Sequence, residues 1–231
     1  MNSRNFWTNF WSEYESDPLN SDEQSQVFRT RDKSPISQAV WNLTLQEVEI
    51  CLELNSTDVL LDLACGNGLF AESFYSKVSL IDALDISKTL IEVLDKKYLN
   101  NVTTHITDIC NYDYPSQYYS KILWYAGIQY IDKKNIIILL TKLRDSLCKG
   151  GKIYIGDIPD ESKLWIYFNT PERKADYFNG ITSNKPLIGT WIQEQWLYQL
   201  LIFLGFSHVE IIPQNPKLIY SDFRFDLLAT L

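Results

Sequence analysis

Val59-Leu60-Leu61-Asp62-Leu63-Ala64-Cys65-Gly66-Asn67-Gly68 carries the strongest structural signal in the chain. Its first half is a short apolar run, typical of a parallel strand that is buried on both faces. Gly66 and Gly68 lack a Cβ, so the backbone can turn sharply there and let a ligand approach closely. A helix is expected from Gly68 to Ser76, and its free N–H groups suit a carboxylate or a phosphate. The stretch therefore predicts a strand, a glycine loop and a helix that together bind a ligand.

Strands and helices alternate beyond this stretch. Further strands are expected at residues 78–84, 102–107, 121–125, 152–157, 209–212 and 223–231. Lys149-Gly150-Gly151 predicts a left-handed end for the helix before residue 152, and Thr190-Trp191-Ile192-Gln193 predicts a capping box for the last helix. This order predicts an α/β fold with a doubly wound, mostly parallel seven-stranded sheet whose last strand is antiparallel. Such a sheet binds its ligand at the carboxyl ends of the strands.

Residues 1–57 are predicted to form an N-terminal helical cap, because aromatic side chains recur at helical spacing from Phe6 to Trp11. Residues 58–231 then form a Rossmann-like domain. Within that domain, residues 158–189 are rich in aromatic side chains and are expected to be irregular. A connection of that length is typical of lids and binding loops, so we expect an insertion beside the ligand.

The composition limits the partners of this chain. Its 231 residues carry a formal net charge of −8, and 45% of them are hydrophobic. These values are typical of a globular protein, and the negative charge disfavours nucleic acid and anionic membranes as partners. The N-terminus lacks an apolar signal sequence, and no apolar run approaches about 18 residues, so a cytoplasmic location is expected. Four cysteines without a Cys-x-x-Cys pair, and only two histidines, lead us to expect no metal site.

The glycine loop alone fits more than one function. Gly66-x-Gly68-x-x-Ala71 also matches the dinucleotide fingerprint, with Asp85 near the ribose position, so a nicotinamide-dependent oxidoreductase is one alternative. A binding module that keeps the pocket without catalysis is another. The glycines are also compatible with a tight turn that binds nothing.

Several further motifs make the chain resemble the class I, Rossmann-like S-adenosylmethionine-dependent methyltransferases, from about Asp58 to Leu231. The resemblance rests on motifs that follow one another in the order of that family, namely Asp62-Leu63-Ala64-Cys65-Gly66-Asn67-Gly68, Asp85, Asp108, Lys149-Gly150-Gly151 and Gly205-Phe206. It implies transfer of a methyl group from S-adenosylmethionine, with S-adenosylhomocysteine as the product.

The resemblance also implies a cofactor site. Asp62 would hold the ammonium of the methionine moiety, Asp85 the ribose, and Asp108 the adenine amino group. The remaining expected cofactor contacts are Ala64, Cys65, Gly66, Asn67, Gly68, Ile86, Ile109, Tyr125 and Ala126. Tyr125 and Ala126 would lie closest to the sulfonium. Cys65 is expected to be a small loop residue and not a nucleophile.

The acceptor is expected to be a small molecule, such as a metabolite, a peptide-derived natural product or a sugar. We expect O-methylation of a carboxylate or a hydroxyl, with N-methylation as the alternative. His105 and His208 are poorly placed for a base, whereas Asp157 follows a strand at the ligand edge and would act either as the base or as a loop-orienting residue. The expected acceptor contacts are Arg29, Trp165, Phe168, Arg173 and Trp191.

Overall fold

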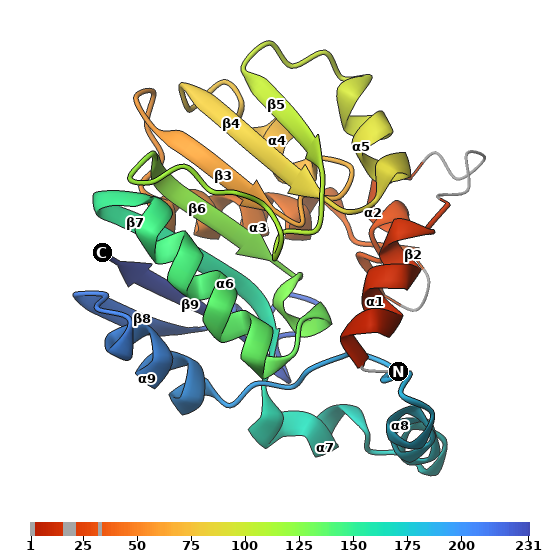
Figure 1. Ribbon diagram of the computed structural model, residues 1–231. Coiled ribbons are helices and arrows are strands. Elements are labelled where there is room, and N and C mark those ends of the chain that lie inside the picture. Colours follow the sequence, from red (N-terminus) through yellow and green to blue (C-terminus); the bar gives the residue numbers. More distant parts are fainter. Residues whose placement is uncertain (1–2, 16–21, 32–33) are drawn as a thin grey trace.

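The computed structural model describes residues 3–15, 22–31 and 34–231. Its main element is a seven-stranded sheet in the order β5-β4-β3-β6-β7-β9-β8 (Figure 1). The strands in this order are β5 (Val102–Ile106), β4 (Leu80–Asp85), β3 (Val59–Leu63), β6 (Tyr119–Tyr125), β7 (Leu147–Pro159), β9 (Arg224–Thr230) and β8 (His208–Pro213). All pairs up to β7 are parallel, and β9 runs antiparallel to both of its neighbours. The predicted α/β fold is confirmed.

Strand β3 lies inside the sheet because its side chains are apolar on both faces. Leu60 and Leu61 are fully buried, and Leu61 lies opposite Asp82 of β4 and Ile122 of β6. Both neighbours are parallel to β3, so the carboxyl ends of β4, β3 and β6 meet at one edge of the sheet. The glycine loop follows β3 at that edge, where a doubly wound sheet binds its ligand.

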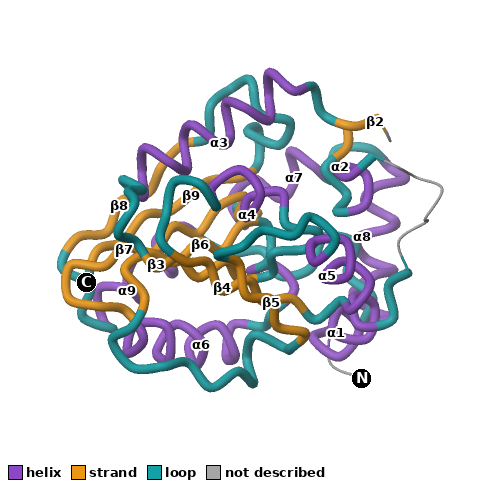
Figure 2. Tube along the Cα trace, turned by 90° about the horizontal axis from the view of Figure 1, so that it is seen from above, coloured by secondary structure: helices purple, strands orange, loops and turns teal. Residues whose placement is uncertain are grey.

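Two layers of helices cover the sheet. One face carries α6 (Lys133–Ser146) and α9 (Glu194–Phe203), and the other carries α3 (Gln38–Leu52), α4 (Leu69–Phe74) and α5 (Lys88–Asp95). Figure 2 shows α3 and α6 on opposite sides of the strands. Trp41 and Val48 of α3 are buried in the same core as β3, so part of the predicted cap forms a layer of the domain itself.

Two predicted helix ends are wrong. Helix α6 ends at Ser146, and the next residue is already extended. Gly150 does have a left-handed φ of +76°, but it lies within β7, where its N–H donates to the Leu231 carbonyl. Helix α9 begins at Glu194 after Gln193, whose side chain makes no capping hydrogen bond. The Thr190 N–H instead donates to Gln129, which ties this segment to the end of β6 and leaves no capping box.

The N-terminal segment lies beyond the carboxyl ends of the strands (Figure 1). It consists of helix α1 (Ser3–Ser12), the short helix α2 (Glu23–Gln26) and the paired strands β1 (Thr30–Arg31) and β2 (Ser34–Pro35). The helical part of the predicted cap is therefore present. The division into a cap of residues 1–57 and a domain of residues 58–231 remains a prediction.

Residues 158–189 are largely helical, so the expectation of an irregular segment is wrong. They include the turn η2 (Glu161–Lys163) and the helices α7 (Leu164–Tyr167) and α8 (Pro171–Ser183). Thr170 caps the start of helix α8, because its hydroxyl accepts a hydrogen bond from the Arg173 N–H, and proline occupies the first helical position. Thr-Pro is a helix-start signal that the sequence reading overlooked.

Candidate functional site

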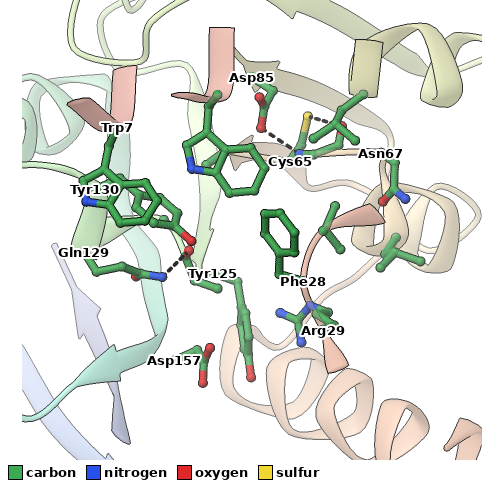
Figure 3. A pocket seen from close by; sticks show the side chains of 18 of the residues that line it. Trp7, Phe28, Arg29, Cys65, Asn67, Asp85, Tyr125, Gln129, Tyr130 and Asp157 are labelled. Carbon is green, nitrogen blue, oxygen red and sulfur yellow. Dashed lines mark hydrogen bonds between the residues drawn. The ribbon is translucent and has the colours of Figure 1, made fainter. Parts of the chain in front are cut away.

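A cavity of about 540 Å³ lies at the carboxyl ends of β3, β4, β6 and β7. Its walls combine the glycine loop and the strand ends with the N-terminal segment (Figure 3). The expected cofactor contacts that line it are Ala64, Cys65, Gly66, Asn67, Asp85, Ile86, Asp108, Ile109, Tyr125 and Ala126. The structure therefore brings most of the predicted cofactor residues together around one space. Asp62 and Gly68 lie behind this wall.

The two glycines of the loop have different tasks. Gly66 lines the cavity with φ +57°, and a Cβ there would lie 2.9 Å from Cγ1 of Val27. Gly68 precedes α4 with φ +80°, and a Cβ there would overlap the side chain of Leu94 in α5. Gly68 therefore allows α4 and α5 to pack closely, while Gly66 keeps the loop backbone next to the cavity.

Asp62 is a buried carboxyl group directly behind the loop. It is 2% exposed, and its Oδ2 has no hydrogen-bond partner among the residues that the structure describes. Burial raises the pKa of Asp62 to about 8, with a further increase from Asp85 and a decrease from Arg29. An unpaired buried oxygen is costly, so this position suits a hydrogen-bond donor brought by a ligand or a water.

Asp85 joins the end of β4 to the glycine loop. Its Oδ2 accepts a hydrogen bond from the Gly66 N–H at 2.9 Å, and its Oδ1 accepts one from the Ser87 N–H at 2.8 Å. Burial raises the pKa of this carboxyl group. The Ile86 N–H also hydrogen-bonds to this carboxylate, which leaves about one of its four acceptor directions. Asp85 can therefore order the loop and still accept a hydroxyl donor from the cavity.

Asp108 caps the turn that follows β5. Its Oδ1 accepts a hydrogen bond from the Cys110 N–H at 2.9 Å, which fixes the turn after β5. Asp108 and the buried Ile109 also line the cavity. The turn-capping role and a ligand contact are therefore compatible in one residue.

Cys65 and Asn67 complete the loop. The Cys65 thiol is buried, and burial raises its pKa well above the usual value, as expected for a packing residue. The Asn67 Nδ2 donates to the carbonyl of Glu23 and to Oε1 of Gln26. The loop thus holds α2 of the N-terminal segment over the cavity.

Arg29 brings a positive charge into the cavity from the N-terminal segment. Its guanidinium lies 4.4 Å from the ring centroid of Tyr125, 5.0 Å from that of Trp41 and 5.5 Å from that of Phe70. Within the described part of the chain, no carboxylate forms an ion pair with it. A cation that stacks on three rings without an acidic partner is available to an anionic group of a ligand.

An aromatic wall, formed by Trp7, Trp11, Phe28 and Tyr130, closes another side of the cavity. The rings of Trp7 and Tyr130 are 4.7 Å apart, and those of Trp11 and Phe28 are 5.5 Å apart. The helical spacing of Trp7 and Trp11 was visible in the sequence, but nothing there indicated that they face a ligand. The sequence reading missed this wall.

Four of the expected acceptor contacts lie elsewhere. The Trp165 side chain is 52% exposed, and Arg173 stacks on Tyr167 and donates to its carbonyl. Phe168 and Trp191 line a separate cavity of about 200 Å³ within the 158–189 segment. These aromatic residues pack on one another, so of the expected acceptor contacts only Arg29 lines the large cavity.

The candidate base Asp157 lines the cavity at the end of β7. Its Oδ2 accepts a hydrogen bond from Nη1 of Arg224 at 2.9 Å, a buried ion pair that the sequence reading missed. Neither histidine lines the cavity: His105 lies 3.7 Å from Asp82, and the side chain of His208 is 66% exposed. In the described ranges, no three His, Cys, Asp or Glu side chains converge as a metal site would require.

The sheet order and the glycine loop together define a class I methyltransferase fold, and sequence comparison agrees. Residues 60–151 match the family model described as a methyltransferase domain. No curated protein matches the chain at a significant level. Within the described ranges, no helix is both long and apolar enough to cross a membrane.

Solved structures of methyltransferases share the fold at low sequence identity. A SAM-dependent methyltransferase from Leishmania major aligns with a TM-score of 0.70 and 12% identity, over 99% of this chain and 83% of that one. Magnesium protoporphyrin IX methyltransferase from Synechocystis, with bound S-adenosylhomocysteine, gives 0.66 and 14%, over 99% of each chain. Phosphoethanolamine N-methyltransferase 2 from Haemonchus contortus, in complex with S-adenosylmethionine, gives 0.72 and 16%, over 100% of this chain and 60% of that one.

The match of residues 60–151 and the shared fold both support the predicted resemblance to the class I, S-adenosylmethionine-dependent methyltransferases. The residues present fit that cofactor. Gly66 brings the loop backbone to the cavity without a side chain, the Asp85 carboxylate lines the same cavity, and Asp62 keeps an unpaired buried oxygen.

Proposed function

We propose that the chain transfers the methyl group of S-adenosylmethionine to an oxygen atom of a small-molecule acceptor, a hydroxyl or a carboxylate, with nitrogen as the alternative atom. The observation that carries this proposal is the continuity of the large cavity. It runs from Asp85 and Asp108 past Tyr125 to the aromatic wall and Asp157, so donor and acceptor can share one space. Two of the similar structures are named for small-molecule substrates, phosphoethanolamine and magnesium protoporphyrin IX, which supports an acceptor of that size.

The cofactor is placed by its polar groups. Asp85 would hold its ribose, and Ile86 and the turn at Asp108 would hold its adenine. Ala64 and Gly66, at the carboxyl end of β3, would lie along its methionine end, and Tyr125 would lie closest to the reacting carbon. Positioning of this kind supplies much of the rate of a methyl transfer, because the sulfonium carbon is already electrophilic.

Arg29 and Asp62 suit the two charges of the methionine end. The charge of Arg29 lowers the pKa of Asp62, so the two groups lie within electrostatic range of each other. Asp62 has an acceptor oxygen without a hydrogen-bond partner, and Arg29 has no carboxylate partner among the described residues. A methionine moiety offers an ammonium to Asp62 and a carboxylate to Arg29. We therefore assign Arg29 to the cofactor, not to the acceptor as the sequence suggested.

Calorimetric titration with two ligands tests this placement. S-adenosylhomocysteine carries the amino-acid end, and 5′-methylthioadenosine lacks it. Replacing Arg29 by Met should weaken S-adenosylhomocysteine about 10–100-fold, the usual worth of a hydrogen bond to a charged group, and leave methylthioadenosine unchanged. Asp85→Ala should weaken both ligands, because both carry the ribose. Equal losses for both ligands in Arg29→Met would contradict the assignment.

The methylated atom is identified from the product. A cofactor with a deuterated methyl group, incubated with the enzyme and a metabolite extract, labels the acceptor for mass spectrometry. An ether or an ester would support the proposal, and the ester is recognised by its hydrolysis in mild base. A labelled N-methyl product would establish N-methylation and contradict the proposed O-methylation.

A further inference from the structure

Asp157 lies at a break in the ladder between β7 and β9. The register of this antiparallel pair shifts between Ile155 and Ile158, and Asp157 has a left-handed φ of +60°. A residue other than glycine in that conformation costs on the order of 1–3 kcal/mol and persists only where its surroundings hold it. Bulges of this kind often redirect a side chain next to an active site.

Two side chains of β9 hold Asp157 in this conformation. Oδ1 of Asp226 accepts a hydrogen bond from the Asp157 N–H at 2.7 Å. Nη1 of Arg224 donates to the Asp157 carbonyl at 2.5 Å and to Oδ2 of its carboxylate at 2.9 Å. The backbone donor and acceptor that leave the ladder are therefore both satisfied by charged groups, which are 7% exposed in Arg224 and 1% exposed in Asp226.

A second layer holds Asp226 in turn. Its Oδ2 accepts a hydrogen bond from the Tyr154 hydroxyl at 2.6 Å, and its Oδ1 accepts one from Nε2 of Gln214 at 2.8 Å. The same Gln214 nitrogen lies 3.4 Å from Oδ1 of Asp157. Arg224 and Gln214 thus contact the Asp157 carboxylate directly, while Asp226, itself held by Tyr154, fixes the Asp157 backbone. A buried polar network whose members are hydrogen-bonded to one another makes the position of such a side chain rigid.

The carboxylate so fixed lines the large cavity. Figure 3 shows Asp157 on the same side as Gln129 and Tyr130, with Tyr125 between it and Arg29. A carboxylate offers about four acceptor directions, and Arg224 and Gln214 occupy two of them. The remaining directions can accept a donor from a molecule in the cavity, whose other walls here are mostly aromatic or aliphatic.

We propose that Asp157 accepts a hydrogen bond from the methyl-accepting group itself, which is therefore a hydroxyl or an amine and not a carboxylate. Arg224 and Asp226 are the positioning residues of this contact. Nη1 of Arg224 pairs with Asp157, and its Nε has no partner among the described residues. The buried group of Arg224, Asp157 and Asp226 brings one basic and two acidic side chains together, so its one cation is already outnumbered. A carboxylate acceptor would add a further negative charge there, and like charges repel strongly in a poorly hydrated site. This inference rests on the proposed function and narrows its acceptor class.

Binding of three small probes tests the acceptor class. Calorimetry with p-cresol, benzylamine and benzoate is carried out on the full chain saturated with S-adenosylhomocysteine. Either donor probe should bind at least about tenfold more tightly than benzoate, and Asp157→Ala should remove that preference. Equal or tighter binding of benzoate, or no binding of any of the three, would overturn the inference. Failure of S-adenosylhomocysteine to bind would instead refute the proposed function, so the two failures are distinguishable.

Variants of β9 test the positioning role. Arg224→Met and Asp226→Ala should abolish the preference for donor probes while S-adenosylhomocysteine still binds, and Arg224→Lys, which keeps a cation, should restore part of it. Glu210→Gln removes an acid with a 58% exposed side chain on neighbouring β8 and serves as the control that retains the preference. If Asp226→Ala fails to fold, Arg224→Met and Arg224→Lys still decide the question. An unchanged preference in Arg224→Met would refute the positioning role.

Discussion

The two halves of the cavity are built in different ways. In the cofactor half, a continuous sequence motif fixes backbone positions, with left-handed φ values at Ala64, Gly66 and Gly68 and a loop tied to Asp85. In the half that the proposed function assigns to the acceptor, side chains from distant segments meet. The aromatic wall joins the N-terminal segment to Tyr130 after β6, and the Asp157 network joins β7 to β9. The first half therefore requires glycine at individual positions of the loop. Under the proposed function, selectivity for the acceptor depends on the side chains of the second half.

The largest expected effect comes from the backbone of the cofactor half. Gly68→Ala should lower the free energy of unfolding by about 2–5 kcal/mol, because it adds a left-handed alanine and an overlap with Leu94. Gly150→Ala is a matched control, since Gly150 has a similar φ of +76° and no atom within 4 Å of the added Cβ. That control should cost about 1–2 kcal/mol. Equal losses in urea denaturation would contradict the packing role of Gly68.

A second effect concerns the charge behind the loop. The pKa of Asp62 rises from the usual 3.8 to about 8 in the folded chain, so the folded state binds an extra proton between these values. Asp62 should therefore make the stability of the ligand-free protein fall as the pH rises from about 4 to 8, and its own contribution is roughly 1.4 kcal/mol per pH unit at most.

Asp62→Asn should remove the Asp62 share of this pH dependence, above all between about pH 6 and 8, because Asp226, with a pKa raised to about 6, contributes below that range. The variant should also make the ligand-free protein more stable at pH 8, while weakening S-adenosylhomocysteine binding. Urea denaturation across this pH range measures the difference between the two proteins. Parallel stability curves for wild type and Asp62→Asn would show that Asp62 does not bear the proton.

Sequence patterns predicted the cofactor half well for a physical reason. Apolar strands, glycines and strand-end carboxylates act locally, so their spacing alone placed β3, the loop and Asp85. The acceptor half depends on contacts between distant segments. Trp165 and Trp191 were expected there because aromatic residues suit a pocket, yet Trp165 packs against Tyr177 and Trp191 against Phe223. One feature of the sequence could have revealed Arg224 and Asp226. Both are charged residues inside an apolar strand, and buried charges of this kind are usually paired with each other or with other polar groups.

The smallest expected effect compares a tryptophan that lines the large cavity with one that lies outside it. Trp11 lines the large cavity, and Trp165 does not. Trp11→Phe should therefore reduce the change in tryptophan fluorescence that accompanies binding of S-adenosylhomocysteine or a probe, and Trp165→Phe should leave that change intact. If Trp165→Phe abolishes the fluorescence change, the 158–189 segment contacts the ligand, and the binding site then extends beyond the large cavity.

Thermal unfolding with cofactor present tests the central claim most directly. A ligand that binds only the folded state raises the melting temperature by mass action. S-adenosylmethionine or S-adenosylhomocysteine should raise that of the wild type, NAD should not, and Asp85→Ala should lose most of the increase because the ribose acceptor is gone. An increase with NAD and none with either methyl cofactor would contradict the account.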